Sequence, residues 1–137
     1  MNSWGSARRA GRFKMSDRYE RGLQTRREVL GDEHVDRMIA GTTPFDAEFQ
    51  RGITETVWAD LWSDPRLDRK TRSLVTIAIL AALRSEELEI HLRASLNTGV
   101  ADEELAEVLR HVAVYAGVPA ANSAIAKAKA VRGGAPP

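Results

Sequence analysis

Apolar residues recur along this chain with helical spacing, and glycine, proline or short polar segments interrupt them at intervals. The pattern predicts seven helices. Their expected ranges are 16–30, 34–40, 44–61, 69–83, 86–98, 102–116 and 119–131. Because the sequence shows no pair of short alternating segments that would form a hairpin, it predicts an all-α fold.

The expected helix ends carry local signals. Ser16 and Asp68 stand where a side chain can cap a helix start, whereas Gly31, Gly99 and Gly117 follow the last apolar position of a helix. The range 44–61 begins with a threonine followed by proline, a frequent helix start. Four apolar residues then follow at four-residue steps and form one face, namely Phe45, Phe49, Ile53 and Val57.

The range 74–83 is apolar on nearly every side, which suits a buried strand as well as a buried helix. A helix is preferred because the segment continues through 81–83 without a turn. Such a helix is central in the fold or is shared with another subunit. Together with the alanine-rich range 120–130, it predicts a homo-oligomer.

The length of 137 residues suits one domain, which we place at 15–131. The range 1–14 holds four basic residues and is expected to be a disordered leader, and 132–137 a disordered tail. Twenty basic residues oppose nineteen acidic ones, so the charge gives no reason to expect a nucleic-acid partner. No apolar run approaches the roughly 20 residues that span a bilayer, and we expect a cytoplasmic protein.

The chain contains no cysteine, which excludes disulfides, thiol catalysis and cysteine-based metal sites. No histidine pair has the spacing of a metal site, and no glycine-rich nucleotide loop is present, so no metal or cofactor is expected. One pair stands out, because Glu87 lies four residues before His91 and both side chains project from one helix face. A carboxylate at that position favours the protonated imidazole, which suits a proton donor, although many such pairs are merely solvated.

Several segments resemble, in order, the carboxymuconolactone decarboxylase family. The resemblance covers about 17–131 and is carried by 19–22, 26–36, 71–74, 86–88, 91–94, 97–100 and 115–122, with Trp58 and Trp62. It implies an alkylhydroperoxidase D-like bundle of about six to seven helices. The wider superfamily has a Glu, a Cys-x-x-Cys and a His at fixed spacing. If its His is His91, its cysteines fall on Arg84 and Glu87 and its Glu on Arg72, so a thiol relay is impossible here.

The resemblance further implies cofactor-free decarboxylation of 4-carboxymuconolactone, a lactone dicarboxylate, to the β-ketoadipate enol-lactone in protocatechuate catabolism. In that reaction His91 would donate the proton with Glu87 orienting it, and Arg72 and Arg93 would bind carboxylates. Trp58 and Trp62 could line the pocket, although core packing is the simpler interpretation, and Arg93 is equally compatible with a solvated position.

The resemblance also implies a homo-oligomer, expected to be a hexamer. Two alternatives stay open from the sequence. One is a different lactone isomerase or decarboxylase on the same fold, and the other is a non-catalytic oligomeric binding module that kept the scaffold. The two classes differ over His91, which an enzyme needs in a cavity with basic residues and a scaffold can leave in solvent.

Overall fold

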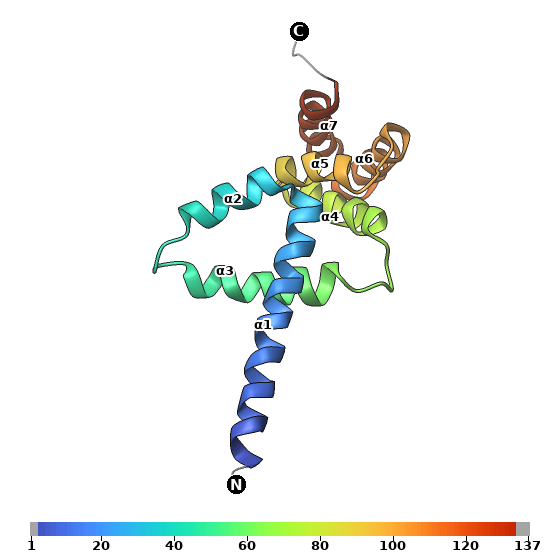
Figure 1. Ribbon diagram of the computed structural model, residues 1–137. Coiled ribbons are helices and arrows are strands. Elements are labelled where there is room, and N and C mark those ends of the chain that lie inside the picture. The colour runs from blue at the N-terminus through green and yellow to red at the C-terminus, as the bar shows by residue number, and fades with distance from the viewer. Residues whose placement is uncertain (1–2, 134–137) are drawn as a thin grey trace. The chain divides into compact units, whose positions relative to one another are not determined.

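The computed structural model describes the backbone of residues 3–133 and the side chains of residues 17–133. Within that range the chain forms seven α-helices and one π-helix without any strand, which confirms the predicted all-α fold (Figure 1). The chain divides into two compact units, residues 1–66 and residues 67–137. Parts of the expected leader and tail, residues 1–2 and 134–137, lie outside the described residues, and the boundaries of the domain at 15 and 131 stay predictions.

The first unit contains four helices in chain order. They are α1 (Ser3–Leu30), α2 (Asp32–Gly41), α3 (Ala47–Ile53) and the π-helix η1 (Thr54–Trp62). Helices α2 and α3 run in opposite directions on either side of a short loop, and α3 leads directly into η1 (Figure 1). Helix α1 passes through Ser16 without a break, so Ser16 is not its N-cap as the sequence suggested; no proline in this stretch would end a helix there.

Helix α1 packs closely along η1. Gly22 makes this approach possible, because a Cβ atom at that position would overlap the carbonyl oxygen of Thr54 and lie 3.2 Å from the Cβ of Ala59. Hydrogen bonds join the same two helices, from Arg18 to the Glu55 carboxylate at 2.9 Å and between the Thr25 and Ser63 hydroxyls at 2.7 Å. The absence of one side chain thus sets how near the two backbones lie.

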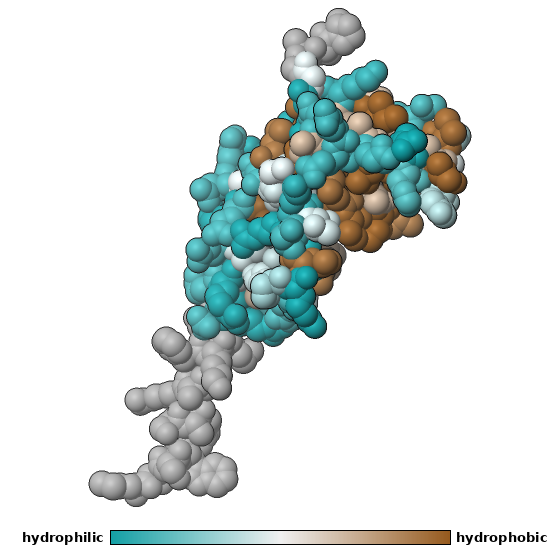
Figure 2. Space-filling view, turned by 90° about the vertical axis from the view of Figure 1, so that its right-hand side faces the viewer, coloured by the Kyte–Doolittle hydropathy of each residue, from teal (hydrophilic) through white to brown (hydrophobic). Residues whose placement is uncertain are grey.

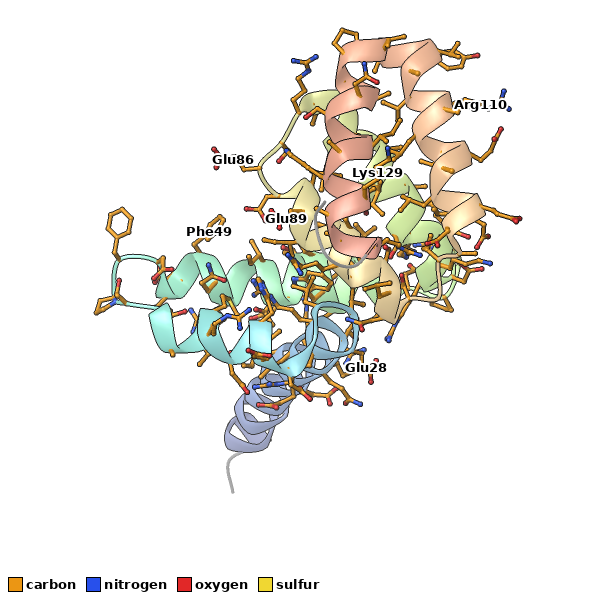
Figure 3. The ribbon with its side chains drawn as sticks, turned by 90° about the horizontal axis from the view of Figure 1, so that it is seen from above. Glu28, Phe49, Glu86, Glu89, Arg110 and Lys129 are labelled. Carbon is orange, nitrogen blue, oxygen red and sulfur yellow. The ribbon has the colours of Figure 1, made fainter. Side chains whose placement is uncertain are left out.

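The π-helix η1 determines which residues of this segment are buried. Its buried residues are Thr54, Glu55, Trp58, Ala59 and Trp62. The wide i→i+5 turn keeps residues four apart nearly in line, so one narrow face stays turned to α1. The apolar face expected from the four-residue steps is not the buried one, since Phe45 is 98% exposed and Phe49 is 64% exposed. Figure 3 shows Phe49 projecting away from α3.

The second unit contains four α-helices of 10 to 15 residues. They are α4 (Arg69–Leu83), α5 (Leu88–Asn97), α6 (Asp102–Ala116) and α7 (Val118–Arg132). Helix α4 packs against each of the other three, and α6 packs along α7. The apolar core of the unit joins all four helices through Ile77, Ala81, Leu88, Leu92, Leu105, Leu109, Val112, Ala120, Ala121, Ala124 and Ala128, with Val100 from the α5–α6 loop.

The helix ends of this unit follow the local signals in the sequence. The Asp68 carboxylate accepts a hydrogen bond from the Thr71 amide at 2.7 Å and caps α4, as predicted. This bond lowers the pKa of Asp68 below its ordinary value, because it favours the charged carboxylate. Gly99 and Gly117 have φ angles of 82° and 107° and follow α5 and α6, where their lack of a Cβ permits these conformations.

Helix α4 is not buried on every side within its own unit. Ile77 and Ala81 are buried in the core, but Val75, Ile79 and Leu83 are 48%, 53% and 72% exposed. These three residues are four apart and form one exposed stripe. The helix therefore has one buried and one exposed side although residues 74–83 are almost all apolar, which leaves the stripe available for contact with another subunit.

Candidate active site

His91 lies in the first turn of α5, in the second unit. Helix α5 begins after a tight turn in which Arg84 has a φ of 53° and the Ser85 hydroxyl accepts a hydrogen bond from the Glu87 amide at 3.1 Å. The His91 side chain is half-buried, and its Nδ1 atom is buried. The histidine is thus partly shielded from solvent, and its role as an acid stays a prediction.

Glu87 occupies the N-cap position of α5 and is exposed. Its backbone carbonyl accepts a hydrogen bond from the His91 amide at 3.4 Å, so the two residues lie one helical turn apart. Among the described residues, however, the Glu87 carboxylate does not hydrogen-bond the His91 ring. The spacing therefore places both residues on one turn without bringing their polar atoms into contact, and the orienting role of Glu87 stays a prediction.

Arg72 lies on α4, which packs directly against α5. Its side chain is 91% buried, since only 9% of the residue is exposed, and its Nε atom is buried. A guanidinium is rarely buried to this degree, because burial removes its hydration. Arg72 and His91 therefore come from neighbouring helices of one unit, with Arg72 buried and His91 half-buried. Their roles toward a substrate stay predictions.

Arg93, unlike Arg72, is exposed to solvent. Its guanidinium donates to the Glu89 carboxylate at 3.0 Å, and both side chains are more than half exposed. Figure 3 shows Glu89 at the surface of the molecule. In the described chain Arg93 thus takes part in a surface ion pair between residues four apart on one helix, which matches the alternative of a solvated position, and its role toward substrate stays a prediction.

Trp58 and Trp62 lie in the first unit, on η1, and only 4% of each residue is exposed. Their rings stack with centroids 5.3 Å apart and an angle of 27° between the planes. Both residues are therefore core residues of the first unit, which agrees with the simpler interpretation. Their use as pocket walls stays a prediction.

Arg26 is a residue that the sequence analysis did not single out for chemistry. It lies on α1 and is 6% exposed, and its guanidinium stands over the Trp58 ring, 5.9 Å from the centroid. It donates to the Thr54 hydroxyl at 3.2 Å and to the Gln50 side-chain oxygen at 3.3 Å. Burial lowers the pKa of this arginine, and the Tyr19 phenol opposes that effect. No pattern of spacing could have revealed it, because one arginine among many reads as a surface residue.

Two hollows are present on the described surface. One, in the first unit, has a volume of about 560 Å³ and lies among α1, α2, α3 and η1. Its lining residues are Tyr19, Leu23, Met38, Ile39, Thr42, Ala47, Glu48, Gln50, Arg51 and Thr54. The other, in the second unit, is an apolar groove of about 360 Å³ beside α6 and α7. None of the six sequence-predicted site residues lines either hollow.

Two further properties bear on the class of protein. Among the described residues, no group of three histidine, aspartate or glutamate side chains has the arrangement of a metal site. In the same part of the chain, no helix combines the length and the apolar character needed to cross a bilayer.

The fold and the site together describe a small all-helical protein. It carries a half-buried histidine and a buried arginine on adjacent helices, and it has no cysteine for thiol chemistry. Residues 47–130 match the model of the carboxymuconolactone decarboxylase family. The chain belongs to this family, as its sequence resemblance indicated.

Relatives of known name agree with this assignment. The chain is 49% identical over 115 residues to 4-carboxymuconolactone decarboxylase of Acinetobacter baylyi, which covers 83% of this chain and 86% of that protein. It is 39% identical over 102 residues to the nitrosuccinic acid decarboxylase npaB of Metarhizium robertsii, covering 74% of this chain and 71% of that one. A stretch of 43 residues, 31% of this chain, is 49% identical to a 4-carboxymuconolactone decarboxylase of Pseudomonas putida and covers 90% of it.

Proposed function

We propose that this protein catalyses the decarboxylation of 4-carboxymuconolactone to the β-ketoadipate enol-lactone. The observation that carries the proposal is the 49% identity to the Acinetobacter enzyme of that name, because the match extends over most of both chains. The second relative is also a decarboxylase by name, although of a different acid. The reaction class is thus common to both relatives, whereas the substrate follows the more similar one.

The chemistry suits a protein without a cofactor. When the bond to the leaving carboxylate breaks, carbon dioxide departs and the bonding electron pair moves through the ring double bond into the lactone carbonyl. A proton then adds to the ring carbon next to that carbonyl, which gives the product with its double bond moved. The substrate carries its own electron sink, so the protein has to bind two carboxylates, stabilise the developing charge and deliver one proton.

The proposal assigns these tasks to residues of the second unit. His91 delivers the proton, and the burial of its Nδ1 atom supports a fixed ring orientation. Glu87, one turn earlier, assists the protonated ring through its charge. Arg72 binds a substrate carboxylate, which its burial on the neighbouring helix supports. Arg93 is a second candidate for a carboxylate, on condition that it exchanges Glu89 for substrate, and Trp58 and Trp62 are candidates for the pocket wall.

The test is an absorbance assay of the purified protein with 4-carboxymuconolactone, in parallel with nitrosuccinic acid. Loss of the lactone chromophore with release of one equivalent of carbon dioxide supports the proposal. Turnover of nitrosuccinic acid alone would transfer the substrate assignment to the second relative. Absence of turnover with both acids would mean that the protein acts on a different substrate or is a binding module without catalysis.

Replacing Arg72 with methionine should raise KM for the lactone about 10- to 100-fold, because a charge-assisted hydrogen bond contributes about 1.5–3 kcal/mol. Methionine keeps much of the apolar stem and removes only the charged head. The matched control is Arg110→Met, which removes an exposed guanidinium that pairs with Glu107 on α6. A KM for Arg72→Met equal to that of the control would contradict the proposed role.

We further propose that the protein acts in the cytoplasm as a homo-oligomer, a hexamer as the resemblance implies. The exposed stripe of Val75, Ile79 and Leu83 on α4 supports an interface, because an aqueous surface rarely carries so much apolar area without a partner. Figure 2 shows a broad apolar area on the surface of the second unit. Most of the alanine-rich face of α7, in contrast, is buried within that unit.

Light scattering coupled to size exclusion should give a mass several times the chain mass at micromolar concentration. Ile79→Lys should lower that mass, because it places a charge in the centre of the stripe. Glu103→Lys, at an exposed polar position of α6, serves as the control and should leave the mass unchanged. A monomeric parent protein would refute the oligomer.

A further inference from the structure

The hollow of the first unit lies beside a buried cation whose hydrogen-bond partners are all neutral. Arg26 donates to Thr54 and Gln50, and both of these residues line the hollow. Its Nε atom is buried and donates to no partner among the described residues, and no carboxylate there forms an ion pair with the Arg26 guanidinium. An arginine 94% buried without a counterion is costly, which a purely structural role does not explain.

The surrounding residues hold this guanidinium in place without neutralising it. The Trp58 ring beneath it supplies a cation–π contact, and Trp62 stacks on Trp58 from the same helix. The Glu55 carboxylate on η1 is already engaged by Arg18 at 2.9 Å, and the Asp60 carboxylate also pairs with Arg18. The charge of Arg26 therefore remains available, and its planar fork suits a carboxylate.

Gln50 offers a route from the hollow to this cation. Its bond to Arg26 is 3.3 Å long, compared with about 2.7–2.9 Å for a charge-assisted bond to a carboxylate. When a carboxylate enters the hollow, Arg26 can therefore replace its long hydrogen bond to the neutral Gln50 oxygen with a shorter one to a charged oxygen. Arg51, which also lines the hollow, adds positive charge there, whereas Glu48 adds a negative one.

We infer that Arg26 is a carboxylate-binding residue, reached from this hollow by displacement of the Gln50 side chain. The ligand of this site is a small carboxylate, and Arg26, Gln50 and the residues that line the hollow all lie in the first unit. The inference therefore does not depend on the proposed function.

The test is a calorimetric titration of the full chain with succinate, with tryptophan emission recorded in parallel because Trp58 lies under Arg26. We expect saturable binding of succinate and none of the neutral succinamide. Arg26→Met should weaken succinate binding about 10- to 100-fold, and Arg26→Lys should weaken it less. The control Arg21→Met removes the same charge from an exposed position of α1 and should bind succinate as the parent does.

Gln50→Glu is a second variant, which tests succinate binding and thermal stability together. It supplies Arg26 with a counterion from the chain itself, so it should block succinate binding and raise the melting temperature. Arg26→Met should unfold at a temperature no lower than that of the parent, because a buried charge without a counterion is lost. A purely structural arginine would instead lower the melting temperature when replaced.

No saturable succinate binding by the parent, or equal binding by the parent and Arg26→Met, would overturn the inference. Absence of lactone turnover with Arg26-dependent succinate binding would refute the proposed function alone.

Discussion

Replacing His91 with glutamine should lower kcat for 4-carboxymuconolactone by about 10²–10⁴-fold, the usual contribution of a general acid, and leave KM within a small factor of the parent value. Glutamine has a similar reach and retains hydrogen bonding, but it cannot transfer a proton at neutral pH. The position of His91 in the first turn of α5, with Nδ1 buried, makes it the candidate acid of the second unit. Steady-state kinetics of both enzymes measures the effect.

Two controls separate this role from a structural one. Glu87→Gln should reduce kcat less, because it alters the charge near the ring and leaves the donor in place. His111→Gln changes an exposed histidine that stacks on Tyr115 of α6, and its kcat should equal that of the parent. If His91→Gln turned over within a small factor of the parent, with unchanged incorporation of solvent deuterium into the product, a different group would be the acid.

Replacing Gly22 with alanine should be among the most destabilising single substitutions in the first unit. The new Cβ would overlap the Thr54 carbonyl oxygen, and backbone cannot move aside as a flexible side chain does. Overpacking usually costs about 1–3 kcal/mol and sometimes more. We expect a loss at or above the upper end of this range in the free energy of unfolding, measured by urea denaturation.

Gly52→Ala provides the matched control, because it adds the same methyl group to an open position. No atom lies within 4 Å of a Cβ built at Gly52, which lies within α3. Here alanine should raise the free energy of unfolding by about 0.5–1 kcal/mol, since glycine is a weak helix former. Equal effects of the two substitutions would show that α1 and η1 do not pack as closely as described.

The elements that local chemistry determines could be read from the sequence. Asp68 caps α4 through its own carboxylate, and Gly99 and Gly117 follow helices with positive φ angles. Such signals act within a few residues and need no knowledge of what packs where. The all-α class followed from the apolar spacing and the lack of paired strand segments, and the membership of the family followed from the ordered motifs.

The properties that depend on partners in space could not be read in this way. Apolar spacing marks Phe45 and Phe49 as one face, but it does not say whether another element covers that face, and both are exposed. The apolar run of α4 does not distinguish Ile77, which is buried in the core, from Ile79, which is exposed at the surface. Arg26 lies in one of the segments that resemble the family, but the sequence carried no sign of its burial. That burial results from the packing of η1 and α3 around a residue far away in the chain.

The wide turn of η1 also affects how the length of this segment can vary. An α-helix turns by about 100° for each residue, and a π-helix arises when such a helix accommodates extra chain. Deleting one residue within η1 would therefore remove extra chain and let the α pattern return, with the residues on either side near their present register. Trp58 and Trp62 would stay on one face, because residues three or four apart share a face of an α-helix. The segment can thus absorb the loss of one residue, whereas the same deletion in a regular α-helix would rotate every later residue by about 100°.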